Sequence, residues 1–356
     1  MIYSKVTGTG SYLPEKILSN LDLEKMFETT DEWITTRTGI KERHIVSAHQ
    51  YTSDLATEAS KQAIKASGID ANKIDLIIVA TTTPDKVFPS TACIVQTKLG
   101  LSLCPAFDIQ AVCSGFVYAL SVADSFIKTG AAKCVLVIGA DTMSRITDYS
   151  DRSNAILWGD GGGAVILEAS DEPGILSTHI HADGAYEKLL HVPSGVSHQK
   201  GKSTIEMQGN QVFKIAVNTL DSIVDETLEM NQLDKSDIDW LVPHQANIRI
   251  LEATAKKLNM SMDRVIVTID RHGNTSAASI PTAFVDGIED GSIKGGETMV
   301  ITAVGAGLAW GAAAIKLGQR VTPLGESDAA LQEFDGTGVD VIQESIDYFV
   351  NRKKES

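Results

Sequence analysis

The chain has 356 residues, of which 43% are hydrophobic and 22% charged, and a formal net charge of −15. This composition is typical of a globular protein, and the length favours two core-forming units over one. The acidic balance opposes nonspecific binding to nucleic acid or to an anionic membrane, so we expect neither as a partner.

Residues 1–16 lack a basic segment followed by a long apolar one, and no stretch approaches about eighteen uninterrupted apolar residues. We therefore expect an unprocessed, cytoplasmic protein. The four cysteines have no CxxC spacing and are too few for a disulfide framework in a chain of this length, so we expect them to be reduced.

Helical and extended patterns alternate along the chain. The clearest predicted strands are 74–80, 133–140, 162–169, 238–244 and 297–305, and the clearest predicted helices are 52–68, 213–230 and 247–259. Such alternation predicts an α/β architecture with largely buried strands.

Two patterns occur twice, in the same order. An apolar residue followed by Asp, at 69–70 and again at 233–234, precedes by three residues an Ile-Asp pair and an apolar strand. Later, Gly130 and Gly291 each precede another apolar strand. These repeats favour an internal duplication whose halves meet near residues 170–175.

The duplication predicts that some residues far apart in the sequence lie close together in the fold. Cys113 and Asn274 each stand seventeen residues before one of the two repeated glycines, at the start of a helical segment, and His244 ends an apolar strand. In pseudo-symmetric halves, equivalent helix starts and strand ends face one another. We therefore expect these three side chains to converge.

The position of Cys113 suggests a nucleophile. A helix N-terminus presents unpaired N–H groups and a partial positive charge, which lower the pKa of a thiol and form an oxyanion site. The alternative is an inert buried cysteine, which is what we predict for Cys93, Cys104 and Cys134.

His244 and Asn274 each have a second interpretation as well. A histidine is often structural, although the C-terminal end of a strand is where α/β proteins place functional groups. Asn274 could cap the helix that begins near Ser276, or it could donate to a carbonyl oxygen. The two roles of Asn274 are compatible.

Three other stretches have the appearance of functional motifs. The alternating histidines of 179–183 fit a strand with one polar face, so we expect no metal site there. The glycine-rich stretches 159–164 and 305–311 do not match a dinucleotide-binding fingerprint. One peptide N–H of the second stretch could complete an oxyanion hole.

Five stretches resemble one enzyme family. They are AVCSGF at 111–116, VPHQAN at 242–247, RHGNTSAASIP at 271–281, DEWITTRTGIKERHI at 31–45 and GDGGGA at 159–164. On these motifs, residues 1–318 resemble β-ketoacyl-acyl-carrier-protein synthase III, the condensing acyltransferases that start fatty acid synthesis in bacteria.

The resemblance implies the α/β thiolase fold, with duplicated βαβαβαββ halves in a five-layer αβαβα arrangement, in a homodimer. On this basis we expect an N-terminal half with the nucleophilic cysteine (1–172), a C-terminal half with the histidine and asparagine (173–318) and a C-terminal extension (319–356).

The resemblance also implies a role for each site residue. The catalytic residues would be Cys113, His244 and Asn274, with an oxyanion hole formed by the backbone N–H groups of Cys113, Ala306 and Gly307. Coenzyme A would be bound by Trp33, Arg37, Arg152 and Phe213. Phe88 would close the acyl pocket of the partner subunit.

A basic patch would receive acyl carrier protein. Its expected members are Lys214, Gln245, Ala246, Asn247, Ile248, Arg249, Lys256 and Lys257. A charge run on a helix is usually just a solvated face, but the acidity of the rest of the chain makes a positive patch a suitable landing site for an acidic carrier.

The implied reaction has two stages. Cys113 takes the acyl group from acyl-CoA, and the enolate formed by decarboxylation of malonyl-acyl-carrier-protein then attacks it. Acyl-CoA is a substrate, and no cofactor is bound permanently. Two alternatives are a family relative that transfers a longer or branched acyl group to another acceptor, and a cysteine thioester hydrolase.

The usual chain of this family ends near Leu317, and this one continues. In the extension, Thr337 could cap a helix in which Val339, Ile342, Ile346 and Phe349 share one face. We expect this helix to pack on the body of the enzyme rather than to bind a partner.

Overall fold

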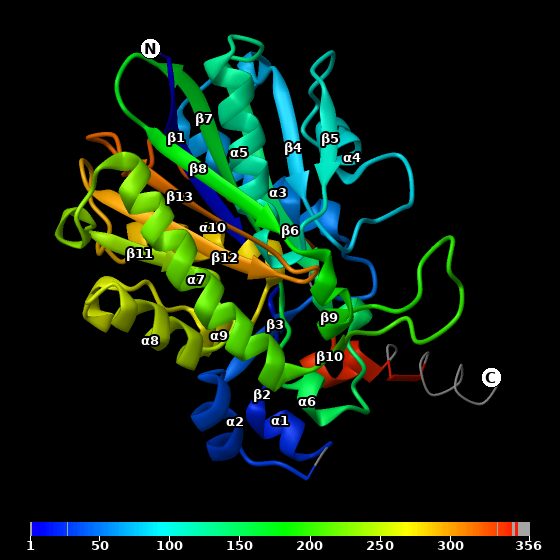
Figure 1. The fold of residues 1–356 in the computed structure, drawn as a ribbon. Helices are drawn as coiled ribbons and strands as arrows, with labels where there is room; N and C mark the ends of the chain where they lie inside the picture. The colour runs from blue at the N-terminus through cyan, green and yellow to red at the C-terminus, as the bar shows by residue number, and fades with distance from the viewer. Residues whose placement is uncertain (1, 27, 333, 344–345, 348–356) are drawn as a thin grey trace.

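The computed structural model describes residues 2–26, 28–332, 334–343 and 346–347. Two large sheets organise this part of the chain (Figure 1). The first has the order β1 (Tyr3–Tyr12), β7 (Asp160–Ser170), β6 (Cys134–Thr142), β4 (Leu76–Ala80), β5 (Ala106–Ile109). The second has the order β11 (Trp240–Pro243), β12 (Thr298–Gly305), β13 (Ala309–Lys316), β8 (Ile175–Ala182).

Strand directions repeat between the two sheets. In the first, β4 runs parallel to β5 and β6, while β7 is antiparallel to β6 and β1. In the second, β11 and β12 are parallel, and β13 is antiparallel to β12 and β8. Parallel pairs need long crossovers, which here are helices.

Helices form three further layers. Between the sheets lie α5 (Gly115–Lys128) and α10 (Ser279–Glu289), as Figure 1 shows. The first sheet is covered on its outer face by α3 (Thr52–Ser67) and α4 (Thr91–Lys98), and the second by α7 (Gly209–Asn231) and α8 (Ile248–Lys257). This is the five-layer α/β arrangement that the resemblance implies.

The central helices are apolar because both sheets bury them. One continuous cluster joins Ile78 of the first sheet, Phe116 and Phe284 of the central helices, and Ile301 of the second sheet. This cluster spans both halves, and each half also has a buried apolar cluster of its own. The chain passes from the first sheet to the second between Ser170 and Ile175.

The second half differs from the first in one strand. Where the first half has β5 at the sheet edge, the second has only a bridge between Val265 and Leu241. The second large sheet therefore has four strands rather than the five that an exact repeat would give.

Smaller elements surround the large sheets. Two further antiparallel pairs are β2 (Lys16–Ser19) with β3 (Glu42–Ile45), and β9 (Leu190–His191) with β10 (Glu206–Met207). Short helices are α1 (Asn20–Glu24), α2 (Asp31–Thr38), α6 (Arg152–Ala155) and α9 (Ile269–His272). Among the described residues, no helix has the length and apolar character needed to cross a bilayer.

The predicted elements are confirmed, with small shifts in their bounds. The helix predicted over 52–68 is α3, and the strands predicted over 133–140 and 297–305 are β6 and β12. The predicted helix 213–230 starts earlier than expected, at Gly209, because its first turn contains polar residues that carry no apolar periodicity.

The helix predicted in the C-terminal extension is also present. Thr337 caps it, because its hydroxyl accepts from Asp340 N–H at 3.2 Å and the Asp340 carboxylate accepts from Thr337 N–H at 2.7 Å. Ile342 is buried against the body of the protein, as expected. Phe349 lies outside the described residues.

Candidate functional site

Cys113 lies where the first half turns from a strand into a central helix. It is in the short 3₁₀ turn Val112–Ser114 that leads into α5, and Val112 before it has a φ of 48°. This left-handed conformation is rare for a β-branched residue, so the turn is strained in the way that functional turns often are. Cys113 is only 3% exposed.

The three predicted catalytic side chains line one pocket. Cys113, His244 and Asn274 meet in a cavity of about 350 Å³ that is also lined by residues of α2, α7, α8 and the end of β12. His244 is 6% and Asn274 5% exposed, so all three are nearly shielded from solvent. The predicted convergence of these residues is confirmed, although Cys113 lies more than 130 residues before the other two in the sequence.

The predicted equivalence of Cys113 and Asn274 is wrong. The second half has a matching turn, Ser276–Ala278, whose first residue has a φ of 52°, and this turn leads into α10 at Ser279. The residue equivalent to Cys113 is therefore Ala277. Counting back from the helix ends missed this because α10 has 11 residues and α5 has 14.

His244 follows β11, and hydrogen bonds hold both its backbone and its ring in place. Its backbone N–H donates to Thr302 O at 2.8 Å, and its Nδ1 lies 2.6 Å from the Ser279 hydroxyl. Because the Ser279 oxygen accepts from the N–H of Gln245 at 3.3 Å, its own hydrogen can be donated to Nδ1. The remaining hydrogen of the neutral ring is then on Nε2.

Burial keeps that ring neutral. It lowers the pKa of His244 to about 3, because the imidazolium form would lose its hydration in this pocket. At neutral pH the side chain is therefore a hydrogen-bond donor at Nε2 without a positive charge.

Asn274 is oriented by the backbone around it. Its N–H donates to Leu157 O at 2.9 Å, its carbonyl accepts from Gly159 N–H at 3.0 Å, and its Oδ1 accepts from Ser276 N–H at 2.9 Å. The last bond is a local turn contact; the N-cap positions of the 3₁₀ turn and of α10 are Thr275 and Ala278, so the capping interpretation of Asn274 is wrong. The bond to Ser276 also fixes the amide so that the NH₂ group is the part left for the pocket.

The end of β12 lies directly against Cys113. A Cβ added to Gly305 would come within 2.6 Å of Ala111 O and 2.9 Å of Cys113 N, so only glycine permits this approach. The following residues, Ala306 and Gly307, line the neighbouring cavity together with Val112. The backbone predicted to form an oxyanion hole is thus beside the thiol.

The environment of the thiol differs from the sequence-based expectation. Burial raises the pKa of Cys113 to about 12, and the nearby charge of Asp141 adds to this effect while the Ser276 hydroxyl counteracts it. The expected lowering of the thiol pKa by the helix N-terminus is therefore wrong in sign for the protein without substrate. Burial dominates because it removes nearly all solvent from the sulfur.

The mouth of the pocket carries the residues expected at coenzyme A. Trp33 and Arg37 of α2, together with Phe213 of α7, line the same cavity as the catalytic residues. The guanidinium groups of Arg37 and Arg152 lie 4.4 and 4.7 Å from the centre of the Trp33 ring. This geometry is suited to cation–π contact and to pairing with phosphate.

Most residues of the expected carrier patch are accessible. Lys214 on α7, and Arg249, Lys256 and Lys257 on α8, are exposed on two helices that pack side by side (Figure 1). Lys257 forms an ion pair with Asp221 at 2.7 Å, which offsets part of the positive charge.

Three members of the patch form the loop into α8. Ala246, Asn247 and Ile248 are half-buried there, and the Asn247 side chain caps α8 and donates to Arg37 O at 3.0 Å. This contact ties the start of α8 to α2, which carries Trp33. The expected carrier residues thus adjoin the mouth of the catalytic pocket.

Gln245 does not belong to this surface. It is 0% exposed, donates to Pro243 O and Ile266 O, and accepts from the N–H groups of Thr268 and Ile269. The prediction that it contacts a carrier is therefore wrong. A polar residue next to His244 was expected at the surface, but here it satisfies buried backbone groups.

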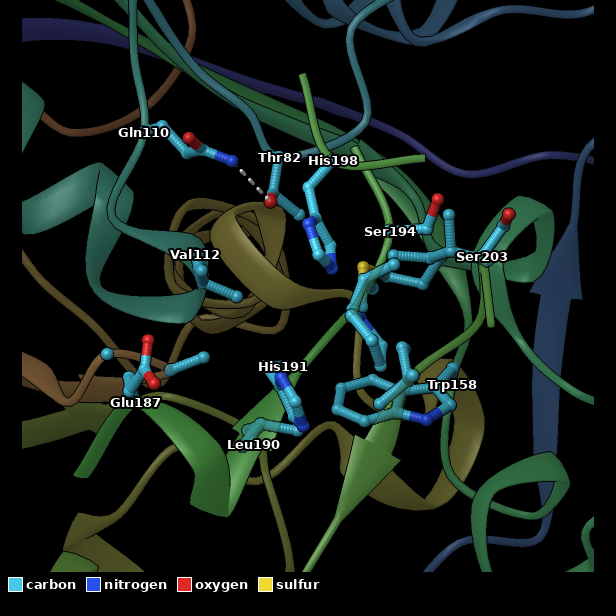
Figure 2. A pocket seen from close by; sticks show the side chains of 17 residues that line it. Thr82, Gln110, Val112, Trp158, Glu187, Leu190, His191, Ser194, His198 and Ser203 are labelled. Atoms are coloured by element: carbon cyan, nitrogen blue, oxygen red, sulfur yellow. Dashed lines mark hydrogen bonds between the residues drawn. The ribbon is translucent and has the colours of Figure 1, made fainter. Parts of the chain in front are cut away.

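A second, larger cavity lies next to the turn that carries Cys113, where Val112 lines it. It has a volume of about 740 Å³ and is lined by Val112, Trp158, Leu190 and Ile205, with His191, His198 and Glu187 among its polar members (Figure 2). Trp158 and Leu190 line both cavities. Phe88, which was expected to close an acyl pocket, is 82% exposed in this single chain.

The alternating histidines of β8 are used within the fold. Nδ1 of His179 lies 3.1 Å from Glu226 Oε1, and Nε2 of His181 lies 2.9 Å from Glu226 Oε2. In the part of the chain that the structure describes, no three His, Cys, Asp or Glu side chains gather as a metal-binding group.

Two site residues were missed by the sequence analysis. Ser279, which orients His244, is 35 residues away from it in the chain, and no spacing pattern links the two. Trp158, which lines both cavities, precedes the glycine-rich stretch, and no pattern in the sequence singles it out. Its partner in an isolated β-bridge is Asn274, so it belongs to the catalytic region.

Comparison with known proteins agrees with this arrangement. The model of the 3-oxoacyl-[acyl-carrier-protein (ACP)] synthase III family matches residues 107–184, and that of its C-terminal part matches residues 228–317. Curated β-ketoacyl-[acyl-carrier-protein] synthases III from Thioalkalivibrio sulfidiphilus and Thiobacillus denitrificans are 60% and 63% identical. Each match covers 89% of this chain and 100% of the relative.

Solved structures of this family superpose well on the chain. The 3-oxoacyl-[acyl-carrier-protein] synthase III from Aquifex aeolicus VF5 has a TM-score of 0.84 at 47% identity, covering 88% of this chain and 99% of that one. The enzyme from Pseudomonas aeruginosa PAO1 has a TM-score of 0.85 at 40% identity, covering 90% and 100%. The chain therefore belongs to the β-ketoacyl-[acyl-carrier-protein] synthase III family and is an acyltransferase with the thiolase fold.

Proposed function

We propose that Cys113, His244 and Asn274 perform the reaction of this family in this chain. That reaction condenses an acyl-CoA primer with malonyl-acyl-carrier-protein, with loss of CO₂, and starts fatty acid synthesis. The observation that carries the proposal is the meeting of these three side chains, all nearly buried, in one pocket that opens past Trp33 and Arg37.

The first stage acylates Cys113. Its sulfur attacks the thioester carbon of acyl-CoA, the bond from that carbon to the coenzyme A sulfur breaks, and the thiol proton ends on the released coenzyme A. The carbonyl oxygen becomes negative in the transition state. Donation from the Cys113 N–H and from the N–H groups at 306–307 would stabilise it there.

The second stage forms the carbon–carbon bond. Malonyl-acyl-carrier-protein loses CO₂, and the resulting enolate oxygen is stabilised by His244 Nε2–H and the Asn274 NH₂ group. The enolate carbon attacks the acyl carbon, the bond to Cys113 breaks, and the thiolate takes up a proton from solvent. Neutral donors suit this step, because no proton is removed from carbon.

The pocket mouth and the α7–α8 surface would bind the two substrates. Trp33, Arg37 and Arg152 offer an aromatic face and two guanidinium groups to the nucleotide of coenzyme A, and Phe213 lines the route to the thiol. The exposed Lys214, Arg249 and Lys256 offer positive charge to an acidic carrier.

We further propose that the enzyme is a homodimer in which Phe88 of each subunit fills part of the other's acyl pocket. The 82% exposure of Phe88 and the 72% exposure of Val87 support this, because an exposed apolar pair often marks an interface. The large cavity beside Cys113 is the space that would receive the acyl chain.

The variant Phe88→Ala tests this proposal. Removing the ring should lengthen the acyl pocket and raise the ratio of kcat/KM for a longer acyl-CoA over a shorter one by about tenfold. The measurement is acylation of Cys113 with a series of acyl-CoA primers, with Val87→Ala as the matched control. An unchanged ratio in Phe88→Ala, with the dimer intact, would show that Phe88 does not line the pocket.

The products distinguish this function from its two alternatives. When the protein, an acyl-CoA and malonyl-acyl-carrier-protein are mixed, mass spectrometry of the carrier should find the β-ketoacyl form, with release of CO₂. Free fatty acid would indicate a thioester hydrolase. An unextended acyl group on the carrier or on another acceptor would indicate simple acyl transfer.

A further inference from the structure

The C-terminal extension follows a defined path over the surface of the fold. After β13, the Arg320 guanidinium donates to Ala66 O and to Thr7 O, both at 3.1 Å, and Leu324 N–H donates to Ala66 O at 3.0 Å. The bonds to Ala66 O satisfy a carbonyl group at the C-terminal end of α3, and the bond to Thr7 O reaches β1. The first part of the extension is therefore anchored to the first half of the protein.

The path then leads towards the mouth of the catalytic pocket. Leu331 N–H donates to the Tyr12 hydroxyl at 3.0 Å, and the helix that follows Thr337 begins against β2. A Cβ added to Gly338 would lie 2.3 Å from Ile17 O, so glycine is required for the helix to start there.

This helix completes an apolar cluster, which we call the entrance cluster. Its buried members are Leu18, Leu23, Ile34, Ile45, Tyr149, Ala155, Ile156, Val341 and Ile342. Trp33 is half-buried against it, as are Val339 and Ile346 from the same helix. The cluster thus joins β2, α1, α2, β3 and α6 to the extension.

The helices that carry Trp33 and Arg152 are too short to be stable by themselves. The helices α1, α2 and α6 have only 5, 8 and 4 residues, which is too short for a helix to be stable without tertiary packing. The entrance cluster is the packing that joins them. Two of its nine buried side chains, Val341 and Ile342, come from the extension.

The extension lies outside what the relatives share. The family model ends at residue 317, and the two curated relatives are matched over their full length by 89% of this chain. The additional packing behind Trp33 is therefore a property of this chain rather than of the shared fold.

We infer that the C-terminal extension positions Trp33 and Arg152 for the nucleotide end of acyl-CoA, with Ile342 as its most deeply buried member of the entrance cluster. The inference rests on the proposed binding of coenzyme A by these residues. A pre-ordered Trp33 ring loses less freedom when the nucleotide binds, so the packing should lower the KM for acyl-CoA. It should not affect the chemistry at Cys113.

Two acyl donors distinguish a role in positioning the nucleotide site from a general effect on the stability of the protein. Acyl-CoA carries the nucleotide, whereas the same acyl group on N-acetylcysteamine presents only the thioester. In full-length Ile342→Ala we expect kcat/KM for acylation by acyl-CoA to fall about tenfold, through KM, with little change for the short thioester. The milder Ile342→Val should retain the fold and show a smaller split of the same kind.

Leu331→Ala is the matched control. Leu331 is also an apolar residue of the extension, but it packs against the cluster around α3 and not against the entrance cluster. We expect no split between the two donors in this variant. An equal loss for both donors in Ile342→Ala, or no loss for either, would overturn the inference.

Trp33→Ala separates the inference from the function on which it rests. This variant should show the same split, and a larger one. If it does not discriminate between the donors, the nucleotide site is wrongly placed and the inference fails with it. If Trp33→Ala discriminates and Ile342→Ala and Ile342→Val do not, only the role of the extension is refuted.

Discussion

Replacing Asn274 by alanine should lower the rate of condensation about 10²- to 10³-fold while the acylation of Cys113 continues at nearly its normal rate. The amide NH₂ group is proposed to donate to the enolate oxygen, which exists only in the second stage. The first stage uses backbone donors beside Cys113, which the substitution leaves in place. The measurement is single-turnover acylation by acyl-CoA, followed by the rate of ketoacyl-carrier formation.

The variant Asn274→Asp is the control for structure. Asn274 Oδ1 accepts from Ser276 N–H at 2.9 Å, and a carboxylate can accept the same bond. The aspartate variant should therefore keep the local turn but lose the NH₂ donor and place a negative charge near the enolate. We expect it to be at least as poor in condensation as the alanine variant.

The contrary result is equally clear. A variant at Asn274 that no longer acylates Cys113 but still decarboxylates malonyl thioesters would assign Asn274 to the first stage. Loss of both activities together with a lower thermal midpoint would indicate that Asn274 acts only by holding the turn before α10 in place.

Alkylation of Cys113 by iodoacetamide should accelerate about tenfold for each pH unit between pH 7 and pH 9. Only the thiolate reacts, and its fraction rises tenfold per unit while the pH is well below the pKa. Burial raises that pKa to about 12, so no plateau is expected in this range. The measurement is the mass-resolved rate of labelling of the peptide that contains Cys113.

Two opposite effects act on the pKa of Cys113, and the larger one decides whether the pKa is raised or lowered. A helix N-terminus stabilises a nearby anion by up to about 2 kcal/mol, or about 1.5 pKa units. Complete desolvation can shift a pKa by about 3 to 5 units. In the free enzyme burial therefore dominates, and its effect on the pKa favours the thiol form of Cys113 at neutral pH.

The half-buried Cys93 in the same digest serves as an internal reference for the reagent. A labelling rate of Cys113 that levels off at or below pH 9 would contradict this prediction. It would mean that the α5 N-terminus, rather than burial, sets the state of the thiol before substrate binds.

The sequence predicted the elements and the candidate catalytic residues because both depend on local patterns. Apolar alternation and helical spacing identified β6, β12 and α3, and Cys113, His244 and Asn274 stand at ends of such elements. Element ends are also where unpaired backbone groups make functional chemistry possible.

Errors arose where the outcome depends on how the halves pack. Gln245 reads as a surface residue beside His244, yet it is buried because the backbone at 268–269 needs an acceptor there. Asn274 was matched to Cys113 by counting along a helix, but the two central helices differ in length, so Ala277 holds that place.

The sequence by itself determined an α/β chain with duplicated halves, a cysteine at a strand–helix junction and a family resemblance in five motifs. Only the tertiary structure decided the neutral state of His244, the raised pKa of Cys113 and the contact of Ser279 with His244. It also decided the path of the extension to the entrance cluster. The physical reason is that solvent exclusion and contacts between distant residues arise from both sheets and all their helices together, whereas sequence patterns report only neighbours along the chain.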